Sequence, residues 1–182
     1  MADLVDAPAK LTRVVGTVEG RAFEAKDAIA ADIPRTNGFG FDGPATFIQI
    51  SDFASACGLS TQGQGPSNSR ILVLGFGSID SAGRSSVPGP GTFTVRSNAQ
   101  PLPNSSLAAQ AYYGSGCGKD HAYSGISGTV TVTTTAAGVV VGSFDVVLSC
   151  FVGCSGPDEH LTGTFTTAGC AALNINTTPV CS

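Results

Sequence analysis

Two histidines are the side chains best suited to acid–base chemistry in this chain, because acidic residues stand directly beside each of them. His121 follows Asp120, and His160 follows Asp158 and Glu159. A histidine near a carboxylate and a serine can form a hydrolase site, since triads are recognised by geometry and not by chain order. The chain has no Gly-x-Ser-x-Gly elbow, and its pattern places both histidines in polar loops, where histidines are more often structural than catalytic. We therefore predict no catalytic residue, and a hydrolase that uses His121 or His160 is the third alternative.

A nucleotide site is not predicted either. Residues 38–43 match the letters of the Gly-x-Gly-x-x-Gly dinucleotide fingerprint. That fingerprint works only between a buried strand and the start of a helix. Here Pro34 precedes it, Pro44 follows it and no helical pattern opens. Residues 34–44 are therefore interpreted as a loop.

One group of residues has the types needed for a zinc site: Cys150, Cys154, His160 and Cys170. Structural zinc sites usually combine two short knuckles, and this chain offers one short cysteine pair. No run of alternating acids suggests a calcium loop, although backbone carbonyls at a loop could still bind calcium. The sequence predicts no cofactor and no metal site.

The even number of cysteines favours disulfides instead. The chain has six, in a sequence with many turns and few charges: Cys57, Cys117, Cys150, Cys154, Cys170 and Cys181. Such a pattern is typical of an oxidising compartment, where disulfides supplement a modest core. We predict that all six form disulfides.

Strand geometry restricts the pairing of these cysteines. If residues 139–148 and 161–166 form an antiparallel hairpin, Cys170 lies near Gly138, roughly 30 Å from Cys150 and Cys154. A disulfide needs Cα atoms within about 7 Å, so Cys170 is predicted not to bond either of them. Cys117, Cys150 and Cys154 gather at the other end, and at least one of these three must reach Cys57 or Cys181.

Threonines recur at every second position in two segments of this meander. Thr129, Thr131 and Thr133 share one strand face, and residues 162, 164 and 166 share another. If these strands were neighbours, their hydroxyl and methyl groups could bind a repetitive ligand such as a polysaccharide or an ice lattice. Threonine is also the favoured residue for the solvent face of a strand, so a structural role is the simpler interpretation.

Composition excludes several classes of protein. The chain has 182 residues, 24 of them glycine, a formal net charge of −4 and 12 % charged residues. Disordered chains are more charged and less apolar, and nucleic-acid binding needs a basic face. No run of 18 apolar residues predicts a transmembrane span. The length suits one domain over residues 12–182, preceded by a flexible lead-in at residues 1–11.

Short strands separated by turns dominate the pattern. Strands are predicted at residues 45–51, 70–77, 92–95, 107–113, 128–134, 139–148 and 161–166. Within residues 23–32 a bulged strand is preferred to a helix. Residues 58–69 are predicted to form a loop. Residues 70–77 are apolar on both faces, as in a central strand buried on both sides. Tyr112 and Tyr113 should point to opposite sides, one buried and one exposed. The expected fold is an all-β antiparallel β-sandwich or flattened barrel of about 7–10 short strands.

Strand and turn motifs over about residues 14–170 resemble those of uncharacterised bacterial secreted or lipoprotein-type domains. The similar segments are 16–23, 26–28, 50–53 leading to Cys57, 127–132, 142–146 and 161–165 closing at Cys170. The resemblance implies an exported, lipid-anchored or surface-located precursor and no reaction. Cys150, Cys154 and Cys181 are additional to that pattern.

We expect an exported or cell-surface protein, from which a signal peptide was removed, that acts as a non-catalytic structural, adhesive or assembly component. Low charge and a mean hydropathy of +0.22 suggest apolar surface beyond one core, so the expected partner is a second copy or another surface protein. The first alternative is a module that binds carbohydrate or another surface.

Overall fold

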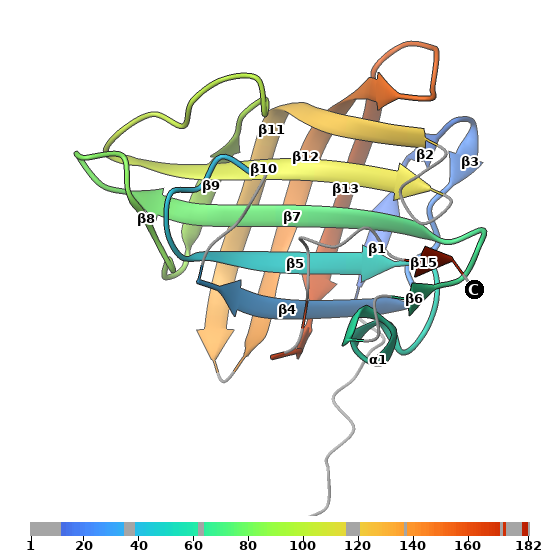
Figure 1. Cartoon of the computed structure of the whole chain (residues 1–182), viewed down its shortest axis with the longest axis horizontal. Coiled ribbons are helices and arrows are strands. Elements are labelled where there is room, and N and C mark those ends of the chain that lie inside the picture. The colour runs from blue at the N-terminus through green and yellow to red at the C-terminus, as the bar shows by residue number, and fades with distance from the viewer. Residues whose placement is uncertain are drawn as a thin grey trace, which may run out of the picture.

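The computed structural model describes residues 12–34, 39–61, 64–115, 121–136, 138–171, 173 and 180–181, and strands dominate these ranges (Figure 1). The strands are β1 (Arg13–Val15), β2 (Thr17–Val18), β3 (Arg21–Ala22), β4 (Asp27–Ile33), β5 (Ala45–Ser51), β6 (Gln64–Gly65), β7 (Arg70–Ile79), β8 (Ser85–Ser86), β9 (Gly91–Val95), β10 (Ser106–Ser115), β11 (His121–Ala136), β12 (Val139–Val152), β13 (Glu159–Thr166), β14 (Ala168–Gly169) and β15 (Val180–Cys181). The predicted all-β class is confirmed.

One curled sheet of eleven strands forms the body of the molecule. Its order is β1-β13-β12-β11-β9-β10-β7-β5-β4-β14, and β8 pairs with β7. In Figure 1, β4, β5, β7 and β10 lie in front of β11, β12 and β13 and cross them. We call β4, β5, β7 and β10 the front half, and β1, β13, β12, β9 and the C-terminal part of β11 the back half. The two halves are continuous, so the shape is a half-barrel rather than a sandwich of separate sheets.

The sheet is mixed, which corrects the prediction of an antiparallel arrangement. β9 is antiparallel to β11 and parallel to β10. β10 and β11 are antiparallel to each other where they pair directly, over residues 112–115 and 121–124. A strand that enters between two antiparallel neighbours must run parallel to one of them, and β9 enters where these two diverge. β14 is likewise parallel to β4.

β11 bends at this divergence. Its pairing with β12 shifts register between Gly125 and Ser127, and Gly128 has a φ of 122°. A bulge of this kind bends a strand and increases its twist. Before the bulge β11 pairs with β10, and after it with β9. The bulge therefore marks where the sheet turns from the front half into the back half.

Apolar side chains pack on both faces of the front half. The inner core, between the two halves, includes Leu72, Leu74, Phe76, Phe93, Tyr113, Val130, Phe144 and Phe165. The outer core, on the opposite face of the front half, includes Ile29, Phe41, Phe47, Val73, Cys170 and Leu173. The prediction that residues 70–77 are buried on both sides is therefore confirmed for β7.

Glycines face phenylalanine rings across neighbouring strands in both cores. The cross-strand pairs are Phe47 with Gly75, Phe144 with Gly163, and Phe165 with Gly142. A Cβ atom at Gly163 would lie 2.7 Å from Cζ of Phe144, and one at Gly142 would lie 2.7 Å from Cζ of Phe165. The missing side chains leave room for the rings to lie against the opposite strand, which explains part of the high glycine content.

The tyrosine pair confirms one prediction and corrects another. Tyr113 is fully buried in the inner core, and Tyr112 packs against the outer core, so the two rings point to opposite faces of β10. Tyr112 is half-buried rather than exposed. The difference arises because the front half carries a second core on the face that was expected to meet solvent.

Two local predictions were right only in part. The preference for a strand over a helix within residues 23–32 is confirmed by β4, which begins at Asp27, but the register of β4 with β5 is continuous, so the predicted bulge is wrong. Within the predicted loop at 58–69, residues 58–61 belong to a short helix, α1 (Ala56–Thr61). Six residues do not form a stable helix by propensity. Here the Ala56 amide donates to Asp27 Oδ2 at 2.8 Å and Cys57 is disulfide-bonded, so tertiary contacts hold the turn.

Two disulfides are described, and both obey the predicted exclusion. Cys57 bonds Cys170, 113 residues away, and Cys150 bonds Cys154. Cys170 was expected near Gly138 at the β11–β12 turn, and the residue before it, Gly169, does lie against Gly138. Because Cys57 is bonded to Cys170, the Cys57 alternative of the predicted link is excluded, and the Cys181 alternative stays a prediction. Cys117 and the side chain of Cys181 lie outside the described residues.

A Gly163→Ala variant tests the glycine–phenylalanine packing. The new Cβ would overlap the Phe144 ring and the backbone of Arg13, so we expect a loss of about 1–3 kcal/mol in the free energy of unfolding. Gly58→Ala is the matched control, because nothing lies within 4 Å of its Cβ position and alanine favours a helix. Urea unfolding measures both. Equal stabilities of the two variants would contradict the packing account.

Candidate functional site

Side chains that are polar with the exception of Val15 cover the outward face of the back half, and the strand register aligns them into two rows. Each row crosses β9, β11, β12, β13 and β1 in turn. The first row is Thr94, Thr129, Asp145, Thr162 and Val15, and the second is Thr92, Thr131, Ser143, Thr164 and Arg13. We call these ten positions the hydroxyl face. All are exposed or half-buried, whereas the residues that stand between the two rows on β9, β11 and β12 are buried: Phe93, Val130 and Phe144.

The predicted threonine face exists in a different form. The threonines of β11 and β13 do lie on one face, but β12 stands between them and contributes Ser143 and Asp145. Thr92 and Thr94 of β9 extend the rows, and sequence analysis missed them because β9 is far from β11 along the chain. The alternation of Thr92 and Thr94 around Phe93 is visible in the sequence and indicates that the two threonines share a strand face. The pairing of β9 with β11 has no such signal in the sequence.

A few contacts organise the hydroxyl face. Thr92 Oγ1 lies 3.2 Å from Thr131 Oγ1, within hydrogen-bond distance. His160, one pair further along β13, places Nε2 2.8 Å from Asp145 Oδ1. Such contacts fix side-chain orientations and leave hydroxyl groups that both donate and accept hydrogen bonds.

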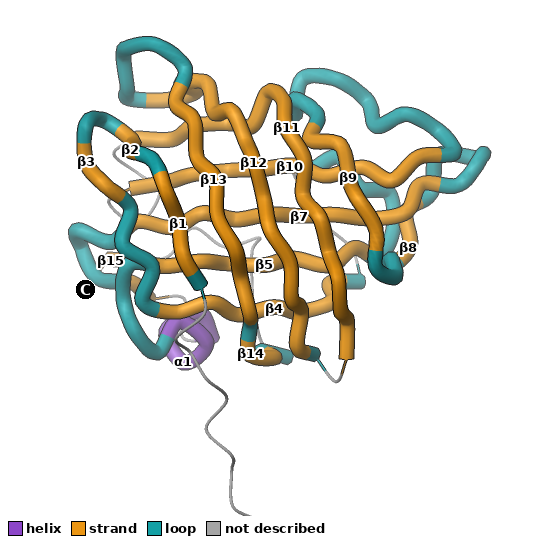
Figure 2. Tube along the Cα trace, turned by 180° about the vertical axis from the view of Figure 1, so that it is seen from behind, coloured by secondary structure: helices purple, strands orange, loops and turns teal. Residues whose placement is uncertain are grey.

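An open groove runs along one edge of the hydroxyl face. It has a volume of about 340 Å³ and is lined by Arg13, Val15, Phe144, Asp145, Thr162, Gly163 and Thr164. It combines a guanidinium, a carboxylate, two hydroxyls and an apolar wall. These groups can hold a polar ligand by hydrogen bonds. Figure 2 shows β1, β13, β12, β11 and β9 facing the viewer with no other described element in front of them.

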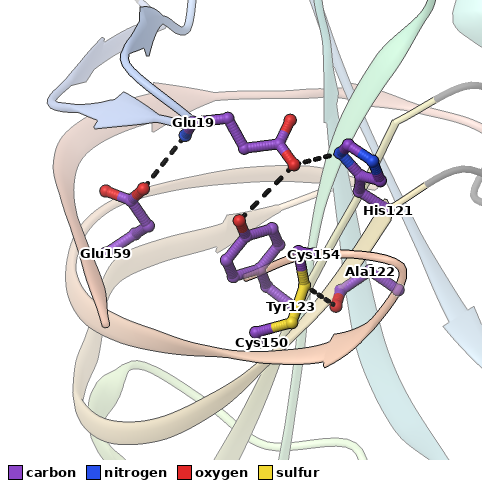
Figure 3. The surroundings of a disulfide bond; sticks show 7 residues. All are labelled: Glu19, His121, Ala122, Tyr123, Cys150, Cys154 and Glu159. Carbon is purple, nitrogen blue, oxygen red and sulfur yellow. Dashed lines mark hydrogen bonds and ion pairs between the residues drawn. A yellow bond between two sulfur atoms is a disulfide. The ribbon is translucent and has the colours of Figure 1, made fainter. Parts of the chain in front are cut away.

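A second polar cluster lies beside the Cys150–Cys154 disulfide (Figure 3). Glu19, in the turn between β2 and β3, contacts His121 Nδ1 through Oε1 and accepts a hydrogen bond from the Tyr123 hydroxyl at 3.4 Å. Its backbone amide donates to Glu159 Oε1 at 3.0 Å. Cys154 Sγ lies 3.3 Å from the carbonyl oxygen of Ala122. These contacts attach the β2–β3 hairpin and the disulfide ring to the start of β11.

Both histidines lie in strands, which corrects their placement in polar loops. His121 is the first residue of β11 and pairs with Ser115, and His160 lies in β13 opposite Val147. β13 begins one residue before His160, at Glu159, which pairs with Leu148. In the part of the chain that the structure describes, both imidazoles pair with carboxylates, Glu19 and Asp145.

The three cysteines that were considered as zinc ligands with His160 are all in disulfides. Cys150 and Cys154 are bonded to each other and Cys170 is bonded to Cys57, so none of these sulfurs is a thiolate. Among the described residues, no group of three His, Cys, Asp or Glu side chains is arranged to hold a metal ion. Within the same residues, no helix is both long and apolar enough to cross a membrane.

A half-buried ion pair and a buried tyrosine lie at this end of the inner core. Arg70 Nε donates to Asp52 Oδ2 at 2.9 Å, and its guanidinium lies 5.5 Å from the centre of the Phe23 ring. Burial raises the pKa of Tyr113 to about 12; the nearby Arg70 charge opposes this rise and the Glu19 charge adds to it. Burial also raises the pKa of Tyr123, and the negative charge of Glu19 contributes.

The Tyr113 pKa predicts a loss of stability at alkaline pH. An unfolded tyrosine ionises near pH 10, whereas folded Tyr113 resists ionisation until about pH 12. Its contribution is therefore complete below pH 10 and decreases as pH rises from 10 to 12, by about 2–3 kcal/mol in total. Urea unfolding from pH 8 to 11 should show a smaller decrease for Tyr113→Phe than for the unmodified protein. Tyr112→Phe is the control and should change the slope less; identical slopes for all three proteins would contradict the argument.

Comparison with known proteins adds no assignment to this geometry. No protein-family model, no curated protein and no solved structure matches the chain.

Proposed function

We propose that this chain is an exported, non-catalytic adhesive domain that binds a polysaccharide surface through the hydroxyl face. The single observation that carries the proposal is the alignment of polar side chains from five strands into two parallel rows. The disulfides support the export, because such bonds persist in oxidising compartments.

The chemistry of the rows favours a sugar polymer. Threonine and serine hydroxyls both donate and accept hydrogen bonds, as sugar hydroxyls do. A carboxylate at Asp145 and a guanidinium at Arg13 interrupt the rows, so the face is not the uniform hydroxyl and methyl array that a repeating ice lattice would require. Neighbouring strands are about 4.8 Å apart, which brings several donors and acceptors under one extended chain.

Each contact at such a face contributes little free energy of binding, and the affinity rises with the number of contacts made at once. A single neutral hydrogen bond contributes about 0.5–1.5 kcal/mol. The described tyrosines do not offer stacking platforms, because Tyr113 and Tyr123 are buried and Tyr112 is half-buried. We therefore expect low affinity for short sugars and much stronger retention on polymers, where many contacts act together. Such a dependence suits an adhesive role.

Self-association is the second candidate, and a specific observation favours it. Phe151 and Val152, at the tip of the β12–β13 hairpin within the Cys150–Cys154 ring, are 72 % and 49 % exposed. Exposed apolar groups of this size can join two copies of a chain or a chain and another surface protein.

A polysaccharide array tests the proposal with a triple variant, Thr129→Val, Thr131→Val and Thr162→Val. Valine keeps the shape and strand preference of threonine while it removes the hydroxyl. We expect at least a tenfold loss of binding to the preferred polymers, and no loss for the control Thr17→Val, which lies in β2 and outside the rows.

Two outcomes would contradict the proposal: no binding to any neutral or acidic polymer on the array, or unchanged binding by the triple variant. Light scattering of the same proteins identifies the second candidate. Oligomers that persist in the triple variant and disappear in Phe151→Ser would assign the adhesive role to contacts between protein copies.

A further inference from the structure

A pocket opens between the two halves of the sheet, at the end of the molecule that holds the β11–β12 turn. Its volume is about 230 Å³. It is lined by Ala30, Ala31, Asp32, Thr46, Val87, Pro88, Thr135, Ala136, Gly138, Val139 and Val140. Since a water molecule occupies about 30 Å³, the pocket has room for roughly eight non-hydrogen atoms.

The floor of this pocket is the inner face of the front half. Along β4, Ala28 and Ala30 point into the inner core, and Asp32 has the same orientation two residues further on. Thr46 pairs with Asp32 across to β5. Small side chains at these inner positions leave the space open, and the strand ends before a large residue can fill it.

The pocket contains one charged group and no matching positive charge. Asp32 is exposed at the pocket, and its Oδ1 accepts a hydrogen bond from Thr46 Oγ1 at 2.6 Å. None of the other lining residues is ionisable, and within the described residues Asp32 takes part in no ion pair of 4 Å or less. Asp32 Oδ2 can therefore accept a hydrogen bond from a cationic ligand.

The remaining walls combine aliphatic surface with one further hydroxyl group, that of Thr135. Val87, Pro88 and Val139 supply aliphatic surface. The backbone amide and carbonyl of Val140 are already bonded to Thr167. A ligand for this site therefore needs a positively charged head group and a short aliphatic body.

We propose that this pocket binds a small alkylammonium compound, with its ammonium group on the Asp32 carboxylate and its carbon chain against Val87, Pro88 and Val139. A charge-assisted hydrogen bond in a partly enclosed site is roughly twice as strong as a neutral one. The pocket is separate from the hydroxyl face. Whether it binds an alkylammonium compound is therefore independent of the result of the polysaccharide experiment.

Amide chemical shifts of the isotope-labelled protein, titrated with n-butylammonium chloride at pH 7 and constant ionic strength, test the site. We expect saturable shifts at residues 30–32, 46, 87 and 138–140. Asp32→Asn should weaken binding about tenfold or more, while the control Asp145→Asn, on the hydroxyl face, should leave it unchanged. Ala136→Leu, which places a larger side chain in the pocket lining, should also weaken binding without changing any charge.

Butan-1-ol is the matched uncharged probe and should bind at least tenfold more weakly than n-butylammonium. The proposal is overturned if butanol and butylammonium bind equally, if Asp32→Asn retains full affinity, or if the pocket residues do not shift at saturating amine. The spectra also report folding, so a variant that fails to fold is recognised, and Thr46→Val then provides a milder test of the Asp32 orientation.

Discussion

Strand β11 has to pair with two different neighbours on the same edge, and the shape of the molecule depends on this constraint. Its first residues pair with β10 and its later residues pair with β9. The bulge between Gly125 and Ser127 bends the strand where the partner changes. Because β9 fills the gap that opens there, the sheet can curl without losing backbone hydrogen bonds. The mixed strand directions follow from the same insertion.

The curl gives the faces of the sheet different roles. Between the halves it encloses the inner core, where glycine opposite phenylalanine allows close packing at Gly142 and Gly163. The front half carries the outer core on its other side, so it is buried on both faces. The back half has one face left for solvent, and that face holds the hydroxyl rows. At one end the halves separate at Asp32, and the pocket lies there.

The strands were predictable because local patterns determine them, whereas the arrangement of strands was not. Alternating residues identified β9 and β13 nearly to their ends, and the doubly apolar sequence of β7 indicated burial on both faces. The position of β9 between β10 and β11 depends on long-range pairing, which leaves no local signal. For the same reason Thr129 and Thr131 were recognised as a face, but their alignment with Thr92 and Thr94 was missed. The histidines were misplaced because the charged residues before them resemble loop.

The most direct test of the account is amide shift mapping with a soluble fragment of the polymer that the protein retains best on the array. The account predicts shifts along the outward positions of β9, β11, β12, β13 and β1, strongest in the rows that include Thr129 and Thr131, and little change in the front half. Shifts confined to the Phe151 hairpin tip, to the Asp32 pocket or to the front half would contradict the claim that the hydroxyl face is the binding surface.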